Sequence, residues 1–531
     1  YFSVGNCGAY FTDNDDKTWR IGASSQQMWW WPKDPEIKDR DPATFGGHKS
    51  DDGNVYVGGF IARMNPDGTG VEILAHNLRN SYENCVTLAG DIFASDNDDQ
   101  PACRTFGVLE GANYGFASRD GSRSWQADRR PGQDIRVASW RQEDPGVAPA
   151  GDVYGGGAPT GIVYYEHGAL GEQWNGTLLL CEPARNTIFG YKPEKQGEGW
   201  KLERFDFLTT NKEGKVIGTD YTGGDKTAKV EDTKTLFRPS DIAVGPDGAI
   251  YIADWYDARV GGHNDLDETL AGTIYRVAPK GFKSVVPPIE LTTEAGRKLA
   301  RKSPAVHVRA LAHVPTVEIN KSALSTDSLI DASETLNVAD RTGLERWGMK
   351  CDQQASAIYD GIMAKQGNPA PLTWSDRLAT IAWRLHPPQS VASFKVRALA
   401  ESLSEKTRQD AMTAIGYNTS KAAANAMFEI AEKSKGMIGS IALWWLLNKK
   451  DNAWKQHGLA SALKSSGLYD PDSIKLSSVG LPEAQAATFT LADAQKLAGD
   501  ATRGKAQSAR CVICHRLGDM GVDFGPNMSE W

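Results

Sequence analysis

The sequence of 531 residues has no run of eighteen apolar residues, so no segment predicts a membrane-spanning helix. It also has no excess of basic residues, because 59 Lys and Arg face 67 Asp and Glu, for a formal net charge of −8. This charge argues against a nucleic-acid partner. No N-terminal leader is visible, but the first residue is Tyr1 and the chain opens in a strand-like phrase. We therefore expect a fragment cut at both ends, in which absent signals carry little weight.

Cysteine is also scarce, with seven residues in the chain, which excludes a disulfide scaffold. Setting aside Cys511 and Cys514 leaves five, an odd number, so at least one is free or paired outside this chain. Cys85 and Cys103 either bridge neighbouring loops or remain buried thiols.

Cys511 and Cys514 belong to the motif Cys-Val-Ile-Cys-His, which ends at His515. C-x-x-C-H is the attachment motif of a c-type haem, in which two thiols form thioethers and the adjacent imidazole ligates the iron. A zinc knuckle would need two more ligands nearby, and His457 is the nearest candidate. A redox C-x-x-C would accompany a βαβ pattern, which is absent. We interpret the motif as a haem c site with His515 as iron ligand. Haem attachment predicts a periplasmic or otherwise exported protein with a redox partner protein.

Strand-like phrases recur between turn signals through residues 1–280. Pro-Asp-Gly stands at residues 66–68 and 246–248 between apolar runs, a pattern typical of β-hairpins. No long helical period intervenes, which indicates a sandwich, barrel or propeller. The repeated apolar phrasing around glycine favours a β-propeller. Residues 29–32, Trp-Trp-Trp-Pro, either form a ligand wall or cover the flank of the sheets.

The pattern changes to helices after a proline-containing linker at residues 281–300. Apolar residues recur at helical spacing through residues 301–469, and the segments repeat about every 30 residues. We predict a HEAT-like repeat of helix pairs whose tryptophans belong to the core. A second linker covers residues 470–498, and residues 499–531 hold the haem motif.

A helix-forming pattern at residues 499–506 precedes the haem motif, and Gly-Pro-Asn at 525–527 follows it. This arrangement resembles the opening of a class I cytochrome c domain, an all-α fold that here would be truncated at its C-terminal end. The resemblance implies that the carbonyl of Pro526 accepts the N–H of His515 and orients this ligand. The sixth ligand of that family lies further downstream, and Met520 and Met528 are candidates only by residue type.

Two phrases of the N-terminal region carry a second resemblance: Asn-Leu-Arg-Asn-Ser-Tyr at residues 77–82 and the segment that opens with Arg238-Pro239-Ser240-Asp241. They resemble the soluble pyrroloquinoline quinone (PQQ) sugar dehydrogenases, the glucose/sorbosone dehydrogenase family of six-bladed propellers. The resemblance covers roughly the last four blades, with the propeller truncated at its N-terminal side. It implies that Arg79, Asn80 and Arg238 bind the carboxylates of PQQ. A structural bridge to a neighbouring Asp is an equal alternative for Arg79.

Residues 96–99, Asp-Asn-Asp-Asp, place three carboxylates and one amide in four positions. Such a turn suits calcium, which the resembling family uses at its quinone, so Asp96 and Asp98 are candidate calcium ligands. A solvated acidic turn is the alternative.

Three positions depart from that family's pattern: Asn6 stands for an Asp, Ala184 for a Lys and Ser240 for an Arg. The family's catalytic His would precede Tyr1, so the catalytic residue is unknown. The order of the three regions also resembles large exported haem proteins of planctomycete-type bacteria. Two hypotheses follow. The chain is an exported oxidoreductase that oxidises a sugar or polyol and passes electrons to the haem, or its propeller is a non-catalytic module that binds a glycan or partner beside an electron-transfer cytochrome.

Overall fold

The computed structural model describes residues 1–24, 46–98, 101–212, 237–256, 272–285, 290–312, 324–473, 496, 500–508, 516–518, 520 and 521. The chain forms two compact units, Tyr1–Tyr469 and Asp470–Trp531. None of the described helices has the length and apolar character needed to cross a bilayer.

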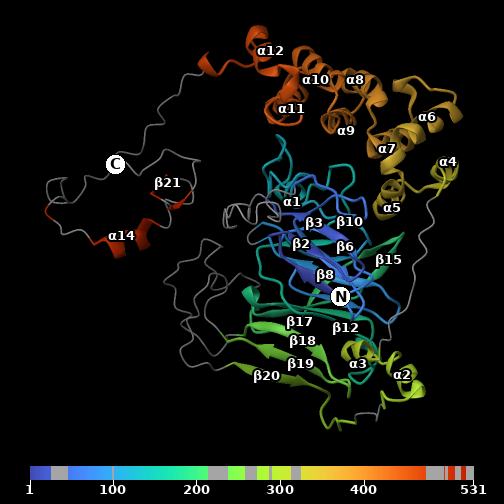
Figure 1. Ribbon diagram of the computed structural model, residues 1–531, viewed down its shortest axis with the longest axis vertical. Coiled ribbons are helices and arrows are strands. Elements are labelled where there is room, and N and C mark those ends of the chain that lie inside the picture. Colours follow the sequence, from blue (N-terminus) through green and yellow to red (C-terminus); the bar gives the residue numbers. More distant parts are fainter. Residues whose placement is uncertain are drawn as a thin grey trace. The chain divides into compact units, whose positions relative to one another are not determined.

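Four sheets follow one another through the first unit, coloured blue to green in Figure 1. The first has the order β1 (Phe2–Val4), β5 (Gly59–Arg63), β6 (Glu72–Leu78), β10 (Ala112–Asn113). The second has the order β11 (Asp152–Gly155), β9 (Cys103–Gly107), β8 (Ile92–Asp96), β7 (Asn84–Val86). The third has the order β12 (Ile162–Tyr165), β13 (Thr177–Glu182), β14 (Thr187–Tyr191), β17 (Arg204–Thr209). The fourth has the order β18 (Pro239–Val244), β19 (Ile250–Asp254), β20 (Thr273–Val277).

The opening strands of the last three sheets, β7, β12 and β18, lie side by side. The amide of Gly161 donates to the carbonyl of Ser240 over 3.2 Å, and the amide of Ile162 donates to Glu83 Oε2 over 2.8 Å. Since both bonds join the starts of strands, the three strands run in the same direction. This arrangement of antiparallel sheets fits a propeller-like fold. In the described part of the chain the sheets do not close into a ring.

Strand β13 shows why the sheets stack face to face. All six of its residues are buried, as in a strand whose sheet is covered on both sides. Leu178 and Leu180 pack with Phe93 of the second sheet, while Leu179 packs with Ile252 of the fourth. The continuous apolar run of β13 is thus shared between two cores, one on each face.

The predicted Pro-Asp-Gly hairpin turns are confirmed. The turn Asn65–Thr69 joins the antiparallel strands β5 and β6, and the turn Gly245–Ala249 joins β18 and β19. Gly68 and Gly248 have φ of 82° and 85°, a left-handed conformation that glycine adopts without a steric penalty.

Two small sheets and a short helix extend this region. Their elements are β2 (Ala9–Thr12), β3 (Thr18–Gly22) and β4 (Tyr56–Val57); β15 (Glu194–Gln196) and β16 (Gly199–Lys201); and α1 (Ile135–Ser139). Cys85 and Cys103 are both buried and are not joined to each other, so the predicted alternative of buried thiols holds and the bridge does not form.

The rest of the first unit is helical, as predicted. Its helices are α2 (Glu294–Ala300), α3 (Val306–Leu311), α4 (Thr326–Thr335), α5 (Arg341–Cys351), α6 (Ala355–Lys365), α7 (Asp376–Leu385), α8 (Val391–Leu399), α9 (Glu405–Gly416), α10 (Lys421–Lys433), α11 (Gly436–Lys449) and α12 (Leu459–Ser466). Helix α2 lies inside the segment predicted as a linker.

Serine side chains begin several of these helices. Ser375, Ser404 and Ser420 are the N-caps of α7, α9 and α10, and each accepts a main-chain N–H of the first turn. Consecutive helices pair, α8 with α9 and α10 with α11, and Trp445 lies in the core between them with 1% of its surface exposed. Trp444 is only partly buried at the edge of this core.

An insertion between β10 and β11 carries contacts to the helices. Arg341 Nη2 of α5 donates to the carbonyl of Asp144 over 3.0 Å, and Asn448 Nδ2 of α11 donates to Asp128 Oδ1 over 3.0 Å. Asp128 also pairs with Arg141 over 3.0 Å. The helical region is therefore joined to the sheet region through charged and amide side chains.

The described part of the second unit contains α14 (Ala501–Ser508) and a hairpin of β21 (Arg516–Leu517) and β22 (Met520–Gly521). The helix predicted ahead of the haem motif is therefore present.

Candidate functional site

Three strands of the sheet region end in an acid, and each acid captures main-chain N–H groups. Asp96 ends β8 and its Oδ1 accepts from the amides of Arg79 and Asn80, over 3.1 and 2.7 Å. Glu182 ends β13 and its Oε1 accepts from the amide of Ala158 over 2.7 Å.

In the fourth sheet, Asp254 ends β19, and its Oδ1 accepts from the amide of Arg238 over 2.9 Å. In each sheet the captured amide belongs to the segment that leads into the opening strand. Because the opening strands run side by side in one direction, these groups lie at the same end of the sheets. We call Arg79, Asn80, Asp96, Glu182, Arg185, Arg238 and Asp254 the rim.

Arg79 lies in the rim with 8% of its surface exposed. Its Nη1 donates to the carbonyl of Asn97 over 2.9 Å, and its own carbonyl accepts from the amide of Asn6 over 2.9 Å. Asn80 follows with an exposed side chain. The guanidinium of Arg79 thus fixes the turn after β8.

Arg238 is fully buried. Its Nη1 donates to the carbonyl of Pro183 and to Asn186 Oδ1, each over 2.7 Å. These two acceptors belong to the first residue and to the C-cap of the 3-10 turn Pro183–Arg185, which follows β13, so Arg238 ties the fourth sheet to the third. The structure therefore brings Arg79 and Arg238 to the same end of the sheets, where both bind main-chain carbonyls.

Asp96 forms a fully buried ion pair. Its Oδ2 accepts from Arg104 Nη2 over 2.8 Å, and neither side chain has exposed surface. The guanidinium of Arg104 lies 3.4 Å from the ring centre of Trp140. Burial lowers the pKa of Arg104, although Asp96 opposes this shift. Asp96 is thus occupied by an arginine and two amides.

Glu182 is the buried acid that our reading of the sequence missed. Its Oε2 accepts from the hydroxyl of Tyr154 over 2.6 Å. Burial raises the pKa of Glu182 to about 7, against the opposing effect of that hydrogen bond and of the Ala158 amide. The neighbouring Arg185 donates from Nη2 to the carbonyl of Gly156 over 2.7 Å.

A signal for Glu182 and Asp254 exists in the sequence. The apolar runs 179–181 and 251–253 are each followed by an acid, and the run 92–94 is followed by Ser95 and then Asp96. An acid at the end of the second strand, in chain order, of three successive sheets indicates a repeated structural role.

The rim can be compared with the needs of the quinone that the resemblance implies. A quinone with three carboxylates needs fixed cations that face it. Arg238 is fully buried, and both Arg238 and Arg79 donate from Nη1 to main-chain carbonyls, so these donors are engaged within the chain. Binding of PQQ by Arg79, Asn80 and Arg238 stays a prediction.

The calcium prediction concerns the turn that begins at Asp96. Among the described residues no three His, Cys, Asp or Glu side chains converge as a metal site requires. Asp98 is fully buried, and Asp99 lies outside the described residues. Calcium binding at Asp96 and Asp98 stays a prediction.

The predicted haem residues Cys511, Cys514, His515 and Pro526 lie outside the described residues, as does the tryptophan-rich segment 29–32. The motif is flanked in the described part by α14 and by the hairpin that starts at Arg516.

Comparison with known proteins gives one family match. The model of a domain of unknown function, DUF7133, matches residues 38–281. A search of curated proteins gave no match.

Several solved structures are similar to this chain. An oxidoreductase (glucose dehydrogenase) from Thermus thermophilus is 15% identical over 51% of this chain and 64% of its own, with a TM-score of 0.28. The PQQ-bound aldose sugar dehydrogenase from Streptomyces coelicolor is 15% identical over 51% and 61%, with a TM-score of 0.27. The soluble aldose sugar dehydrogenase from Escherichia coli is 15% identical over 43% and 53%, with a TM-score of 0.26. This chain spans less than two thirds of each. TM-scores this low do not establish a shared fold, so these similarities carry no argument about activity.

Proposed function

We propose that this chain is an exported oxidoreductase that takes a sugar or polyol in its propeller-like region and passes electrons to a c-type haem. The observation that carries the proposal is the motif Cys511-Val512-Ile513-Cys514-His515. Its spacing suits two thioether links and an adjacent iron ligand, the arrangement that attaches a c-type haem. Bound haem would supply one-electron transfer.

The chain's own residues would hold and orient this haem. Cys511 and Cys514 would attach it and His515 would ligate the iron, while Pro526 would accept the second imidazole N–H and fix the ring. The helix α14 directly before the motif supports a cytochrome-type domain. Covalent haem attachment, if it occurs at this motif, would require an exported location and would call for a separate redox partner protein. The pairing of α8 with α9 and α10 with α11 supports a HEAT-like repeat.

A second candidate function is favoured by a specific observation. Arg79 and Arg238 donate to main-chain carbonyls, so the propeller-like region could bind a glycan without oxidising it. The haem would then serve electron transfer alone. For this reason we route no chemical step through a quinone at the rim.

One experiment separates the two. The full chain, exported by a host that attaches haem c, is run on a denaturing gel and stained for haem. We expect the stain in the wild type and its absence in the Cys511→Ser, Cys514→Ser variant. The oxidised protein is then mixed with glucose, sorbitol and a panel of aldoses, and haem absorbance is followed.

Reduction of the haem by one of these compounds supports the oxidoreductase. Stained haem that no sugar or polyol reduces leaves the binding module with an electron-transfer cytochrome. A wild type that loses haem on denaturation contradicts both functions.

A further inference from the structure

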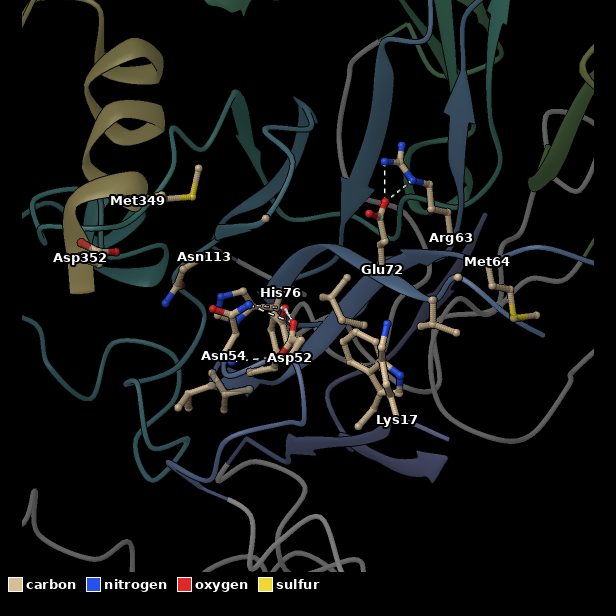
Figure 2. Close-up of a pocket in the computed structure, with 18 of the residues that line it drawn as sticks. Lys17, Asp52, Asn54, Arg63, Met64, Glu72, His76, Asn113, Met349 and Asp352 are labelled. Atoms are coloured by element: carbon tan, nitrogen blue, oxygen red, sulfur yellow. Dashed lines mark hydrogen bonds and ion pairs between the residues drawn. The ribbon is translucent and has the colours of Figure 1, made fainter. Parts of the chain in front are cut away.

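A cavity of about 1180 Å³ lies beside strands β4 and β6 of the sheet region and the C-terminal end of α5. In Figure 2, Asp52 and Asn54 lie near His76 of β6 at its centre, and Asn113 of β10 lies on one side. Its lining holds more Asp and Glu than Lys and Arg side chains. The charge of this cavity therefore has the same sign as the net charge of the chain.

A buried cluster with the opposite charge balance lies where the insertion between β10 and β11 meets α11. It contains four cations and two acids, namely Arg123, Arg130, Arg141 and Lys449 with Asp128 and Asp144. We call these six residues the joint cluster. The five side chains of the insertion are 3% to 22% exposed, and Lys449 is 8% exposed.

The arginines of the joint cluster already hold both of its acids. Asp128 accepts from Arg123 Nε over 2.8 Å and from Arg141 Nη2 over 3.0 Å. Asp144 accepts from Arg130 Nη1 over 2.9 Å. The three arginines thus exceed their two carboxylates by one charge before Lys449 is counted.

The nearest charged groups at the edge of the cluster do not correct this imbalance. Glu143 pairs with Arg130 over 3.2 Å, but it also pairs with Lys406 of α9 over 3.4 Å. The charges of Glu143 and Lys406 cancel each other. A protonated Lys449 therefore leaves the joint cluster with two positive charges in excess.

Lys449 ends α11 and has aromatic rings in place of an acid partner. Its Nζ lies 5.4 Å from the ring centre of Trp445 and 5.7 Å from that of Tyr417. It makes no hydrogen bond or ion pair with a residue that the structure describes. Nζ is not one of the sealed side-chain nitrogens of the described residues, so the exposed part of Lys449 includes the amine.

The surroundings of Lys449 favour its neutral form. Burial lowers the pKa of Lys449 to about 8, and the charges of Arg123 and Arg141 add to this shift, while Asp128 and Asp144 oppose it. About half of such an amine is neutral at pH 8, and the neutral amine is the nucleophile.

We propose that Lys449 is a carbon dioxide site, at which the Nζ amine is reversibly converted into a carbamate. The Nζ lone pair forms a bond to the carbon of CO₂, one C–O π bond opens to give an oxyanion, and a proton leaves Nζ for water. Carbon dioxide is small and uncharged, so it can reach an amine that is almost buried. No oxidant or reductant takes part.

The carbamate corrects the charge balance of the joint cluster. It replaces a cation by an anion, so that three anions then face three arginines. Attraction between opposite charges is stronger at buried sites than in water, which favours the carbamate here over one on an exposed lysine. The proposal goes beyond the oxidation proposed above and uses no rim or haem residue.

The test uses the full chain in sealed vessels at pH 8, with isotope-labelled bicarbonate in equilibrium with CO₂. A trialkyloxonium reagent converts carbamates into stable esters, and tandem mass spectrometry of the digested protein then locates the labelled carbon. We expect the label on Lys449. The neighbouring Lys450, which pairs with Asp451 and lies outside the joint cluster, should carry at least about tenfold less.

Two variants report on the cause. Arg123→Gln removes one cation of the joint cluster and should lower the labelled fraction of Lys449 at least about threefold. The control Arg129→Gln, an exposed arginine outside the cluster, should not. Lys449→Arg keeps the positive charge but forms no carbamate. Since a group that forms on the folded chain stabilises it, bicarbonate should raise the melting temperature of the wild type above that in chloride of equal ionic strength, but not that of Lys449→Arg.

These melting temperatures also confirm that each variant folds. The proposal is overturned if Lys449 carries no label, if Lys450 carries as much, or if folded Arg123→Gln is labelled as the wild type is. It is also overturned if bicarbonate changes the melting temperatures of the wild type and of Lys449→Arg equally.

Discussion

Asp96 offers the sharpest test of how the rim is built, because the structure makes it a structural acid. Its carboxylate is the partner of the fully buried Arg104 over 2.8 Å. Among the described residues, Nε and Nη1 of Arg104 have no hydrogen-bond partner. Asp96 is the ion-pair partner of this buried charge, and the rings of Trp140, Phe106 and Tyr114 lie 3.4, 5.0 and 5.4 Å from the guanidinium.

Replacement Asp96→Asn removes the negative charge and leaves the guanidinium in place. Breaking a buried ion pair at one partner costs about 3–5 kcal/mol, since the other charge remains buried. One amide oxygen can still accept from Asn80, so we expect the lower half of that range, about 3–4 kcal/mol. Arg104→Met in the same chain removes the orphaned charge and should recover about 1–3 kcal/mol of the free energy of unfolding.

The assay is urea unfolding followed by tryptophan fluorescence, with Asp91→Asn as control. Asp91 pairs with Lys195 over 3.2 Å, but these side chains are 31% and 55% exposed. An exposed pair contributes about 0.2–1 kcal/mol, so the control should unfold almost as the wild type does.

A loss below about 1 kcal/mol in Asp96→Asn would refute the structural role. Calcium-dependent stabilisation of the wild type that disappears in Asp96→Asn would show instead that Asp96 binds the metal.

Two further predictions concern stability. The pKa of Glu182 is raised from 4.5 to about 7 by burial, so its folded form holds a proton that the unfolded chain releases. The contribution of this protonated carboxyl to the free energy of unfolding is on the order of 3 kcal/mol. It is fully present below pH 4.5 and is lost as the pH rises through 7. Between pH 5 and 8 the wild type should lose more unfolding free energy than Glu182→Gln does. The exposed control Glu172→Gln should follow the wild type, and equal slopes in all three chains would contradict this cause. Trp445→Ala should lower the unfolding free energy by about 3–5 kcal/mol, as expected for a core tryptophan. The partly buried Trp444→Ala should lose less, and a normal melting temperature in Trp445→Ala would contradict the packing of α9 to α11.

Local patterns predicted the parts of the fold that depend on local energetics. A Pro-Asp-Gly sequence favours a tight turn with glycine in the left-handed conformation, and this preference depends on neighbouring residues alone. The turns at Gly68 and Gly248 could therefore be predicted. Helical spacing predicted the region from α4 to α12, and the segment before Cys511 contains the expected helix α14. Cys85 and Cys103 could not be decided, because disulfide geometry depends on the distance between strands.

The partners of charged groups could not be predicted in the same way. Arg104 meets Asp96 across neighbouring strands of one sheet, whereas Arg238 reaches Pro183 in another sheet. The residues around an arginine in the sequence do not determine which main-chain carbonyl its guanidinium will contact. The cavity at His76 was missed for the same reason, because Asn113 reaches it through the parallel pairing of β10 with β6.

The pair Arg79-Asn80 shows why a sequence resemblance and a structural role can coincide. Asp96 accepts from both of their amides, and this capture depends on the main chain and not on the arginine side chain. The third sheet supports this, because Glu182 captures the amide of Ala158, which has no charge to offer a cofactor. An acid at the end of the second strand of a sheet therefore favours one main-chain geometry in the segment that leads into the first strand of that sheet. Residue types that favour this geometry would be retained whether or not a cofactor binds. The cofactor-binding role and the structural role differ in what the guanidinium contacts. In Arg79, Nη1 donates to the main-chain carbonyl of Asn97.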